Sequence, residues 1–349
     1  MRAAWHRVVY RNQAARSLDH SRGVEILHSG GLKSDIRLRA AKRLLPRPII
    51  ARCEEFNDPM DAPVRALIAQ LGKKSTPKKP RVLYHYTSAS ALIGILKTKT
   101  LWATNIRFLN DSTEYQIALN IARRVIQERI STSTIKREKA LFAVLEERLT
   151  DITGDVYVSS FTENGDQLSQ WRAYCPTAGG YAIGFDSDAL FQQQEKDTQF
   201  LVRCIYEPAE HQKAVVHILE HLVGLAETSR RDGTDQDRVL RETYKLLGRL
   251  LPPLAPMLKD PSFAEEREWR LVRLGAPIGD DSVKFRIGHS MLIPYCEHSF
   301  GELGAPIEAV CVGPTPHPDL ARESTESLLT SHGLPTATVH SSIIPFRTL

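Results

Sequence analysis

The 349-residue sequence has few cysteines, and their spacing fits neither a disulfide scaffold nor a zinc site. The five cysteines are scattered along the chain, and none belongs to a C-x-x-C pair. Disulfide frameworks and structural zinc sites use even numbers of cysteines or closely spaced pairs. We therefore expect reduced thiols and a cytoplasmic location.

Long apolar runs are also missing. No stretch approaches the roughly 18 to 20 apolar residues that span a bilayer. The first 18 residues carry charge throughout and contain no continuous apolar segment of the kind that a secretory signal requires. These two absences predict a soluble protein with no membrane partner.

Several catalytic and nucleotide-binding motifs are absent as well. The sequence has no G-x-S-x-G nucleophile elbow and no G-x-G-x-x-G loop. The spacing of Gly179, Gly180 and Gly184 is reminiscent of a phosphate loop, but the Lys-Ser/Thr of a P-loop does not follow it. Serine hydrolases and P-loop nucleotide-binding proteins are therefore disfavoured.

Charge is distributed unevenly. Residues 1–81 hold 18 Lys or Arg against 7 Asp or Glu, a net of +11, whereas residues 82–349 hold 28 against 34, a net of −6. The run GKKSTPKKPR at 72–81 is typical of a proline-broken linker. We predict a basic, partly disordered extension over 1–80, followed by a domain over 81–349. The extension could bind RNA or an anionic surface, act as a transit peptide, be a solvated tail, or result from an over-extended start before Met60.

Short strand-like runs alternate with long helical patterns after residue 81. Strands are expected at 82–87, 101–109, 155–161, 179–186, 200–206, 268–274, 283–288, 307–313 and 337–344. Helices are expected after Ser88, at 111–130, 134–149, 168–174 and 318–332, and over 207–258 with breaks near Gly233 and at Pro252. This order predicts an α+β fold with a mixed sheet and inserted helices.

Two groups of polar residues could carry chemistry. His217 and His221 form an H-x-x-E-H motif on a predicted helix, which is the pattern of a zinc hydrolase, although no third ligand is evident. On an extended strand, Glu266, Glu268 and Arg270 would share one face. Such a face needs water, a ligand or cross-strand pairs, so an exposed sheet face is the alternative to a site.

Three segments resemble a known family. They are LYHYTS with LWATNIRFLNDSTEY, VYVSSFTENGDQLSQWRAY with GGYAIGFD, and FAEEREWRL. Over about residues 81–274 the chain resembles the bacterial domain-of-unknown-function family 2971. The opening of that family is similar, more distantly, to the NAD-using ADP-ribosyltransferases, in which a first-strand His or Arg, a second-strand Ser or Tyr and a late-strand Glu form the site. His85 matches the first position, Ser159-Ser160-Phe161 the second and Glu266-x-Glu268 the third. The sequence departs from the pattern in two ways, since SSF replaces the more usual STS and long helices separate the second and third motifs.

This resemblance implies a split sheet of ADP-ribosyltransferase-like architecture, NAD as substrate, no metal, and a protein or nucleic-acid acceptor, in a toxin or phage-defence protein. It also implies a role for each residue of the site. Glu268 would stabilise the transition state and Glu266 would position the acceptor. The expected NAD-binding residues are His85 and Thr87 for the ribose, Tyr86, Trp102 or Tyr181 for stacking, Ser160 near the nicotinamide, and Arg172 or Arg270 for the pyrophosphate. A non-catalytic ligand-binding or nucleic-acid-binding module is the alternative.

Overall fold

The computed structural model describes residues 80–109, 114–152, 155–176, 179–192, 199–288, 290–300 and 306–345. All of them belong to the second of the two units into which the chain divides, Cys53–Leu349. The extension expected over 1–80 lies outside the described residues, apart from Pro80. Within the described residues, no helix combines the length and the apolar character needed to cross a membrane.

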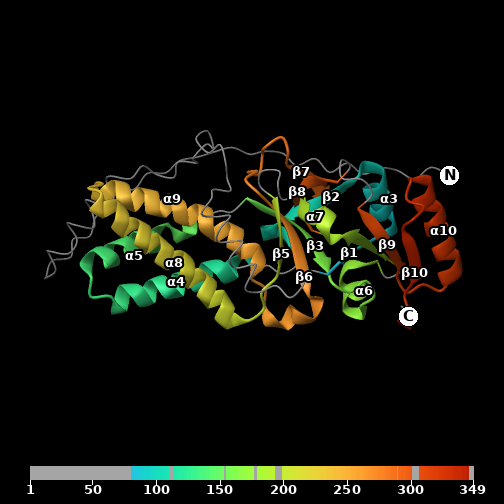
Figure 1. The fold of residues 1–349 in the computed structure, drawn as a ribbon, viewed down its shortest axis with the longest axis horizontal. Coiled ribbons are helices and arrows are strands. Elements are labelled where there is room, and N and C mark those ends of the chain that lie inside the picture. Colours follow the sequence, from blue (N-terminus) through green and yellow to red (C-terminus); the bar gives the residue numbers. More distant parts are fainter. Residues whose placement is uncertain are drawn as a thin grey trace, which may run out of the picture. The chain divides into compact units, whose positions relative to one another are not determined.

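The described residues form an α+β fold around a mixed sheet (Figure 1). The strands are β1 (Val82–Thr87), β2 (Thr100–Asn105), β3 (Val156–Thr162), β4 (Tyr181–Asp186), β5 (Gln199–Arg203), β6 (Glu268–Leu274), β7 (Lys284–Ile287), β8 (Leu292–Ser299), β9 (Ile307–Val312) and β10 (Thr338–Ser341). The α-helices are α3 (Ala89–Thr98), α4 (Glu114–Thr132), α5 (Lys136–Arg148), α6 (Leu168–Tyr174), α7 (Ser187–Gln192), α8 (Pro208–Arg231), α9 (Gln236–Leu254) and α10 (Pro318–Ser331). Short 3-10 helices are η1 (Ile106–Phe108), η2 (Leu149–Asp151), η4 (Ala255–Met257) and η5 (Pro261–Glu266).

The sheet divides at β3. The main strand order is β10-β9-β4-β1-β3-β2-β8-β7, while β6 pairs with both β3 and β5. Of the strand pairs described, β9 and β10 are parallel and the others are antiparallel. Because β6 pairs with β3 along its whole length, β1 and β2 must share the opposite edge of β3.

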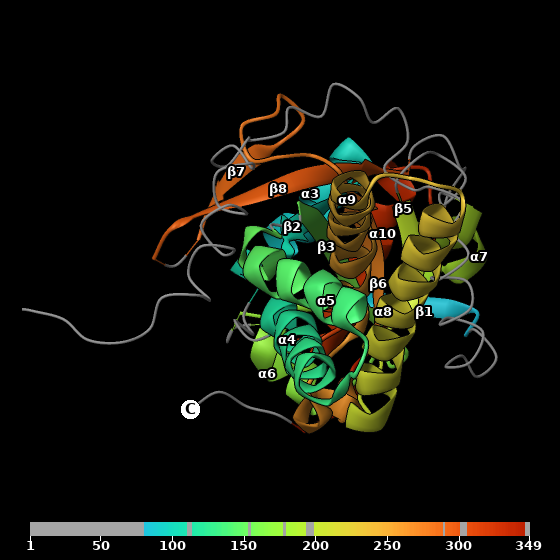
Figure 2. The same ribbon diagram turned by 90° about the vertical axis from the view of Figure 1, so that its left-hand side faces the viewer.

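Two apolar clusters cover the opposite faces of the sheet. One face of β3, β5 and β6 packs against α4, α5, α8 and α9, whose helical pattern places Val, Ile and Leu toward the strands. Figure 2 shows these four helices gathered on one side of the sheet. The other face packs against α3, α7 and α10 through residues such as Leu92, Leu190 and Leu329. The sheet is therefore covered on both faces, and the helix α6 covers only the part near β1 and β4.

The structure confirms the predicted α+β class with a mixed sheet, and it corrects two details. The strand β8 was not predicted, because Pro294 lies inside it and proline argues against a strand interior. Pro252 does not break the helical stretch, since it lies in the last turns of α9. The break near Gly233 does separate α8 from α9.

Candidate functional site

The shared edge of β3 creates a fork in the sheet. The strand β1 joins this edge where Tyr84 faces Thr162, and β2 joins it where Thr104 faces Val158. Of the described strand pairs, none on this edge reaches Ser160, which lies between the two junctions. A backbone carbonyl at such a position needs another donor.

His85 supplies that donor. Its Nδ1 lies 2.9 Å from the carbonyl oxygen of Ser160 and donates a hydrogen bond to it. Burial lowers the pKa of His85, and the positive charge of Arg286 lowers it further, although the Ser160 carbonyl acts in the opposite direction. The imidazole is therefore neutral near pH 7, and the proton on Nδ1 leaves Nε2 as a hydrogen-bond acceptor.

A hollow of about 60 Å³ lies beside this fork. Its lining combines hydroxyl, amide, imidazole and carboxylate groups with aromatic rings. The lining residues are Tyr84, His85, Tyr86, Ser160, Phe161, Thr162, Gln170, Tyr174, Glu266 and Glu268. Aromatic rings combined with a few convergent polar groups are the lining typical of ligand-binding sites.

The carboxylate end of the hollow is a buried ion cluster of Lys259, Glu266, Glu268 and Arg270. The Nε and Nη2 atoms of Arg270 donate to the two carboxylate oxygens of Glu268 at 2.8 and 3.0 Å. The ammonium group of Lys259 donates to both Glu266 and Glu268. All four residues are at most 8% exposed, so two cations balance two carboxylates away from water.

These charges keep Glu268 ionised. Burial alone would raise the pKa of Glu268, but the guanidinium of Arg270 and the ammonium of Lys259 outweigh it and lower that pKa well below its usual range. Lys259 also stays charged. Burial lowers its pKa, but the carboxylate of Glu268 raises it, and the net shift is upward. The cluster therefore presents a fixed carboxylate to the hollow at neutral pH.

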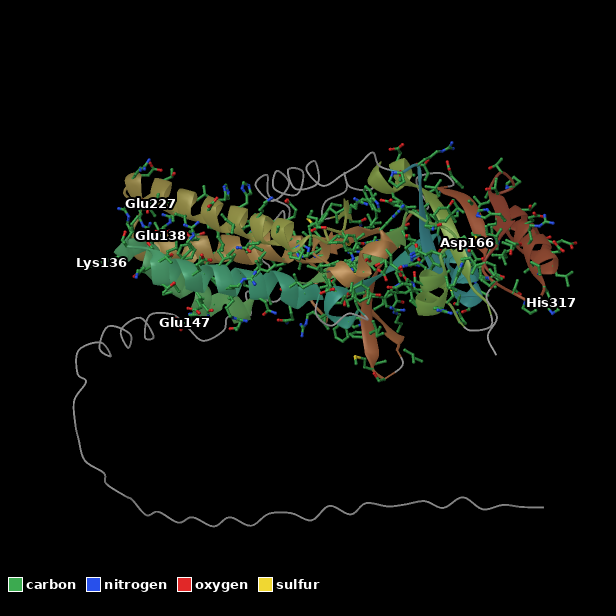
Figure 3. The ribbon with its side chains drawn as sticks, turned by 90° about the horizontal axis from the view of Figure 1, so that it is seen from below. Lys136, Glu138, Glu147, Asp166, Glu227 and His317 are labelled. Carbon is green, nitrogen blue, oxygen red and sulfur yellow. The ribbon has the colours of Figure 1, made fainter. Side chains whose placement is uncertain are left out.

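The helix α6 closes the hollow on another side. Asp166, labelled in Figure 3, accepts hydrogen bonds from Trp171 Nε1 at 2.7 Å and from Ser342 Oγ at 2.6 Å. These bonds anchor α6 so that Gln170 and Tyr174 line the hollow. The hydroxyl of Tyr174 donates to Glu266 at 3.3 Å, which ties the helix to the ion cluster.

Some of the residues proposed from the sequence meet at this hollow. The structure brings together His85, Tyr86, Ser160, Glu266 and Glu268. It places the others outside the lining: Thr87 is buried opposite Tyr181 at the end of β1, Trp102 is 49% exposed on β2, Arg172 is exposed on α6, and Arg270 lies behind Glu268. Six of the lining and supporting residues were not proposed as site residues, namely Tyr84, Phe161, Thr162, Gln170, Tyr174 and Lys259.

The arrangement of Glu266 differs from the sequence prediction. It does not share a strand face with Glu268, because it is the last residue of η5 and β6 begins only at Glu268. Between them Arg267 has a φ of 44°, a left-handed conformation that turns the chain. The alternative of an exposed sheet face is also wrong, since the carboxylates and Arg270 are buried.

The histidine pair of α8 lies elsewhere. His217 and His221 are both exposed, on the side of α8 that faces away from the apolar core. Among the residues that the structure describes, no group of three or more His, Cys, Asp or Glu side chains could hold a metal ion. No geometry found in this part of the chain supports the zinc hydrolase alternative.

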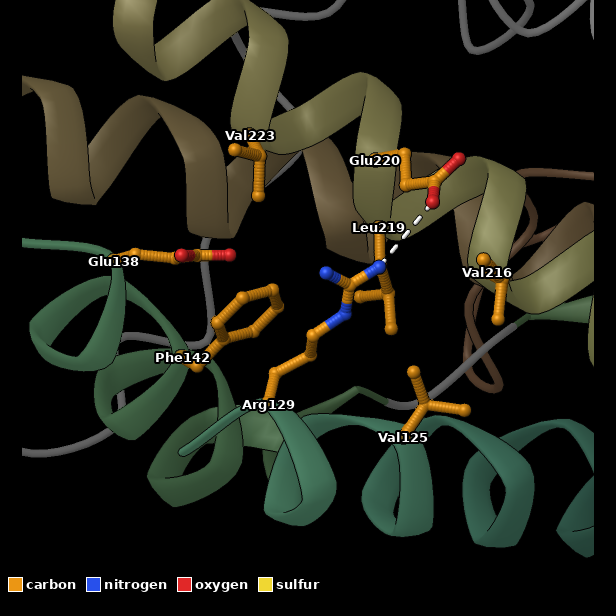
Figure 4. A pocket seen from close by; sticks show the side chains of 8 residues that line it. All are labelled: Val125, Arg129, Glu138, Phe142, Val216, Leu219, Glu220 and Val223. Carbon is orange, nitrogen blue, oxygen red and sulfur yellow. Dashed lines mark hydrogen bonds and ion pairs between the residues drawn. The ribbon is translucent and has the colours of Figure 1, made fainter. Parts of the chain in front are cut away.

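A second hollow, of about 130 Å³, lies among α4, α5 and α8 (Figure 4). Apolar side chains line it, and an ion pair between Arg129 and Glu220, with a distance of 3.2 Å, crosses it. Although larger, it offers no neutral base, hydroxyl nucleophile or buried carboxylate to a ligand. The fork hollow is therefore the better candidate for chemistry.

Comparison with known proteins finds a family model that is similar to part of this site. Residues 170–271 match the family model described as Protein of unknown function (DUF2971). The matched stretch begins inside α6 and contains the whole ion cluster, but neither β1 nor β3. No curated protein and no solved structure matches the chain. The similarity to ADP-ribosyltransferases thus stays a prediction.

Proposed function

We propose that the chain is an NAD-dependent ADP-ribosyltransferase-like protein that acts at the fork hollow. One observation carries the proposal: His85, Ser160 and Glu268 come from three separate strands and line the same hollow. The resemblance assigned ribose contact, nicotinamide contact and transition-state stabilisation to these positions. An acceptor on a protein or nucleic acid, a cytoplasmic location and a role as a toxin or in phage defence belong to the same proposal.

The proposed reaction transfers a glycosyl group. The bond between ribose C1′ and the nicotinamide nitrogen breaks, and its electron pair stays on that nitrogen, which neutralises the pyridinium. The acceptor nucleophile forms the new bond to C1′ and loses its proton. As the old bond breaks, positive charge develops on the ribose, and a fixed carboxylate beside it stabilises that charge. Glu268 is that carboxylate in this proposal.

The remaining lining groups have roles that match their hydrogen-bonding capacity. The free acceptor of His85, Nε2, would take a hydrogen bond from a ribose hydroxyl. Tyr84 and Tyr86 offer aromatic rings for stacking on nicotinamide, although the Tyr86 hydroxyl already donates to Asn164. Glu266, held by Lys259 and Tyr174, would accept the proton of the acceptor nucleophile.

A non-catalytic ligand-binding module is the second candidate, and one observation favours it. Lys259 and Arg270 together neutralise Glu268, which reduces the field that its carboxylate exerts on a developing cation. A site built for binding alone would tolerate this neutralisation. The hollow is also small, so a dinucleotide would extend beyond it.

An assay with the full-length protein distinguishes the two candidates. NAD labelled in the adenosine part is incubated with the protein and a cell extract, and released nicotinamide, transferred label and NAD affinity are measured. The transferase proposal expects nicotinamide release and label transfer. NAD binding without release would establish a binding module for NAD, and absence of both would refute the transferase and any module that binds NAD.

A further inference from the structure

Arg286 is a cation near the fork that has no carboxylate partner in the described part of the chain. It lies on β7, and its Nη2 donates to the hydroxyl of Thr104 on β2 at 2.9 Å. Its Nε is buried and has no hydrogen-bond partner among the described residues. Buried donors are normally satisfied, so an unpaired guanidinium nitrogen needs an explanation.

The position of Arg286 connects it to the hollow. Thr104 faces Val158 on β3, and this is the pair of the β2–β3 ladder that lies nearest to the fork. Ser160 lies two residues further along β3 on the same face, a step of about 7 Å. The charge of Arg286 also reaches His85, whose pKa it lowers. The guanidinium of Arg286 therefore lies near the point where β2 joins β3, at one end of the fork.

An exposed aromatic ring lies on the other arm of the fork. Trp102 is two residues from Thr104 on the same face of β2, and it is 49% exposed. Its ring stacks against Tyr295 with a centroid distance of 4.5 Å, which holds it in place. A large aromatic ring left half exposed on a rigid sheet is a stacking surface for a base.

Other basic residues near this site are already paired. Arg270 donates to Glu268, and Lys284, two residues before Arg286 on β7, forms an ion pair with Glu297 at 2.8 Å. Burial lowers the pKa of Arg286, as expected for a cation that has lost water without gaining an anion. A bound anion would supply the missing partner.

We propose that Arg286 and Thr104 bind the pyrophosphate of a dinucleotide whose ribose end enters the fork hollow, while Trp102 stacks on its far base. This inference rests on the proposed function for the choice of ligand, and it assigns the pyrophosphate to a residue that the sequence did not suggest. The guanidinium donates through Nε and a terminal nitrogen to phosphate oxygens, an arrangement that arginine makes with two parallel bonds.

The test measures binding to the full-length protein by calorimetry, with ADP-ribose, nicotinamide riboside and inorganic pyrophosphate as probes. Arg286→Gln should weaken ADP-ribose binding about tenfold or more, because a charge-assisted bond to phosphate is lost. Its affinity for nicotinamide riboside, which has no phosphate, should stay unchanged. Lys284→Gln removes the same charge from the same strand and should affect neither ligand, since that ammonium already has a partner.

Two further variants show whether misfolding, rather than the loss of a phosphate contact, weakens ADP-ribose binding. Arg286→Lys keeps the charge but loses the Nε donor, so it should bind ADP-ribose with intermediate affinity. Thr104→Val removes the hydroxyl that holds Arg286 and should weaken ADP-ribose binding but not nicotinamide riboside binding. Pyrophosphate should compete with ADP-ribose in the wild type, and its competition should be lost in Arg286→Gln.

The outcomes separate this inference from the proposed function. ADP-ribose binding that depends on Arg286, without nicotinamide release from NAD, would support the subsite and refute the transferase. Nicotinamide release that Arg286→Gln leaves unchanged would support the transferase and overturn the subsite. Equal ADP-ribose affinity in Arg286→Gln and Lys284→Gln, or no binding of any phosphate probe to the wild type, would also overturn the subsite.

Discussion

The carboxylate of Glu268 accepts two hydrogen bonds from the guanidinium of Arg270, at 2.8 and 3.0 Å, from a position two residues earlier on the same strand. Residues spaced in this way share a face of the strand, which brings the two side chains together. The ammonium of Lys259 completes the charge balance from a different segment. The carboxylate is therefore held in one orientation before any ligand arrives.

The first prediction concerns the stability of this cluster. Glu268→Gln removes one of two buried negative charges and leaves two cations, so we expect the free energy of unfolding to fall by about 3 to 5 kcal/mol. The double variant Glu268→Gln with Lys259→Met leaves one carboxylate and one guanidinium and should recover most of this loss. Urea unfolding measures both. A double variant no more stable than the single one would contradict the charge-balance argument.

The second prediction uses the same pair of variants for catalysis. If Glu268 stabilises the transition state, the double variant should fold well and bind NAD, yet release nicotinamide about 10²- to 10³-fold more slowly. Glu265→Gln is the matched control, because Glu265 is an exposed glutamate of the same η5 segment. It should keep the wild-type rate. Equal rates in all three proteins would remove Glu268 from the mechanism.

The third prediction is the pH dependence of stability. The pKa of Glu268 is lowered in the folded chain from 4.5 to about 2, so the folded state holds fewer protons than the unfolded state between these values. Its contribution, about 3 kcal/mol, should be complete above pH 4.5 and disappear as the pH falls toward 2. For Lys259 the shift is upward from 10.5, so its contribution should be complete below that value and fall only at higher pH.

The measurement is the difference in unfolding free energy between the wild type and the charge-balanced double variant. This difference should be constant between about pH 5 and 10, and outside this range the wild type should lose stability relative to the double variant, which lacks both titrating groups. Groups elsewhere in the chain titrate in both proteins and cancel. A difference that does not change between pH 5 and 3 would show that Glu268 is not held ionised by its two cations.

Much of the fold could be predicted because local sequence and tertiary structure agree there. The strands β1, β3, β4 and β9 are apolar runs of β-branched and aromatic residues, and α4, α8 and α10 have clear helical periodicity. The strand β8 could not be predicted, because Pro294 lies among its apolar residues and a proline argues against a strand interior. Only its ladders with β2 and β7 show that the segment is extended.

The site was harder to predict for a physical reason. His85 and Glu268 lie on strands, so their positions follow once strands are predicted and paired. Lys259 lies in a connection between η4 and η5, and its ion pairs depend on a chain path that no periodicity encodes. Similarly, the left-handed turn at Arg267 could not be predicted, because such turns usually contain glycine and this one does not. The turn moves Glu266 off the strand. The pairing of charges was thus set by tertiary structure.

The fourth prediction concerns the hydrogen bond across the fork. His85→Leu removes the donor to the Ser160 carbonyl, so we expect unfolding to become easier by about 1 to 3 kcal/mol. His340→Leu, at an exposed position on β10, is the control and should change stability little. Thermal unfolding compares the two. Equal melting temperatures would show that water replaces His85 at the fork without cost.

The last prediction concerns the shape of the hollow. Gly165 lies in the loop after β3, and a Cβ added there would come within 2.5 to 2.8 Å of the ring of Tyr84, a lining residue. Real Cβ atoms do not approach so closely, so Gly165→Ala must displace the ring or the loop. Overpacking of this kind costs about 1 to 3 kcal/mol. We therefore expect a lower melting temperature and weaker binding of nicotinamide riboside.

The matched substitution is Gly94→Ala in the helix α3, where an added Cβ meets nothing within 4 Å. Alanine is favoured over glycine inside a helix by about 0.5 to 1 kcal/mol, so this variant should melt slightly higher and bind as the wild type does. The same Gly→Ala substitution is thus expected to lower the melting temperature at Gly165 and to raise it at Gly94. Gly165→Ala could instead bind nicotinamide riboside with wild-type affinity despite a lower melting temperature. The Tyr84 ring would then not form part of the ligand site. Binding would have to rest on His85, Ser160 and Glu268 alone.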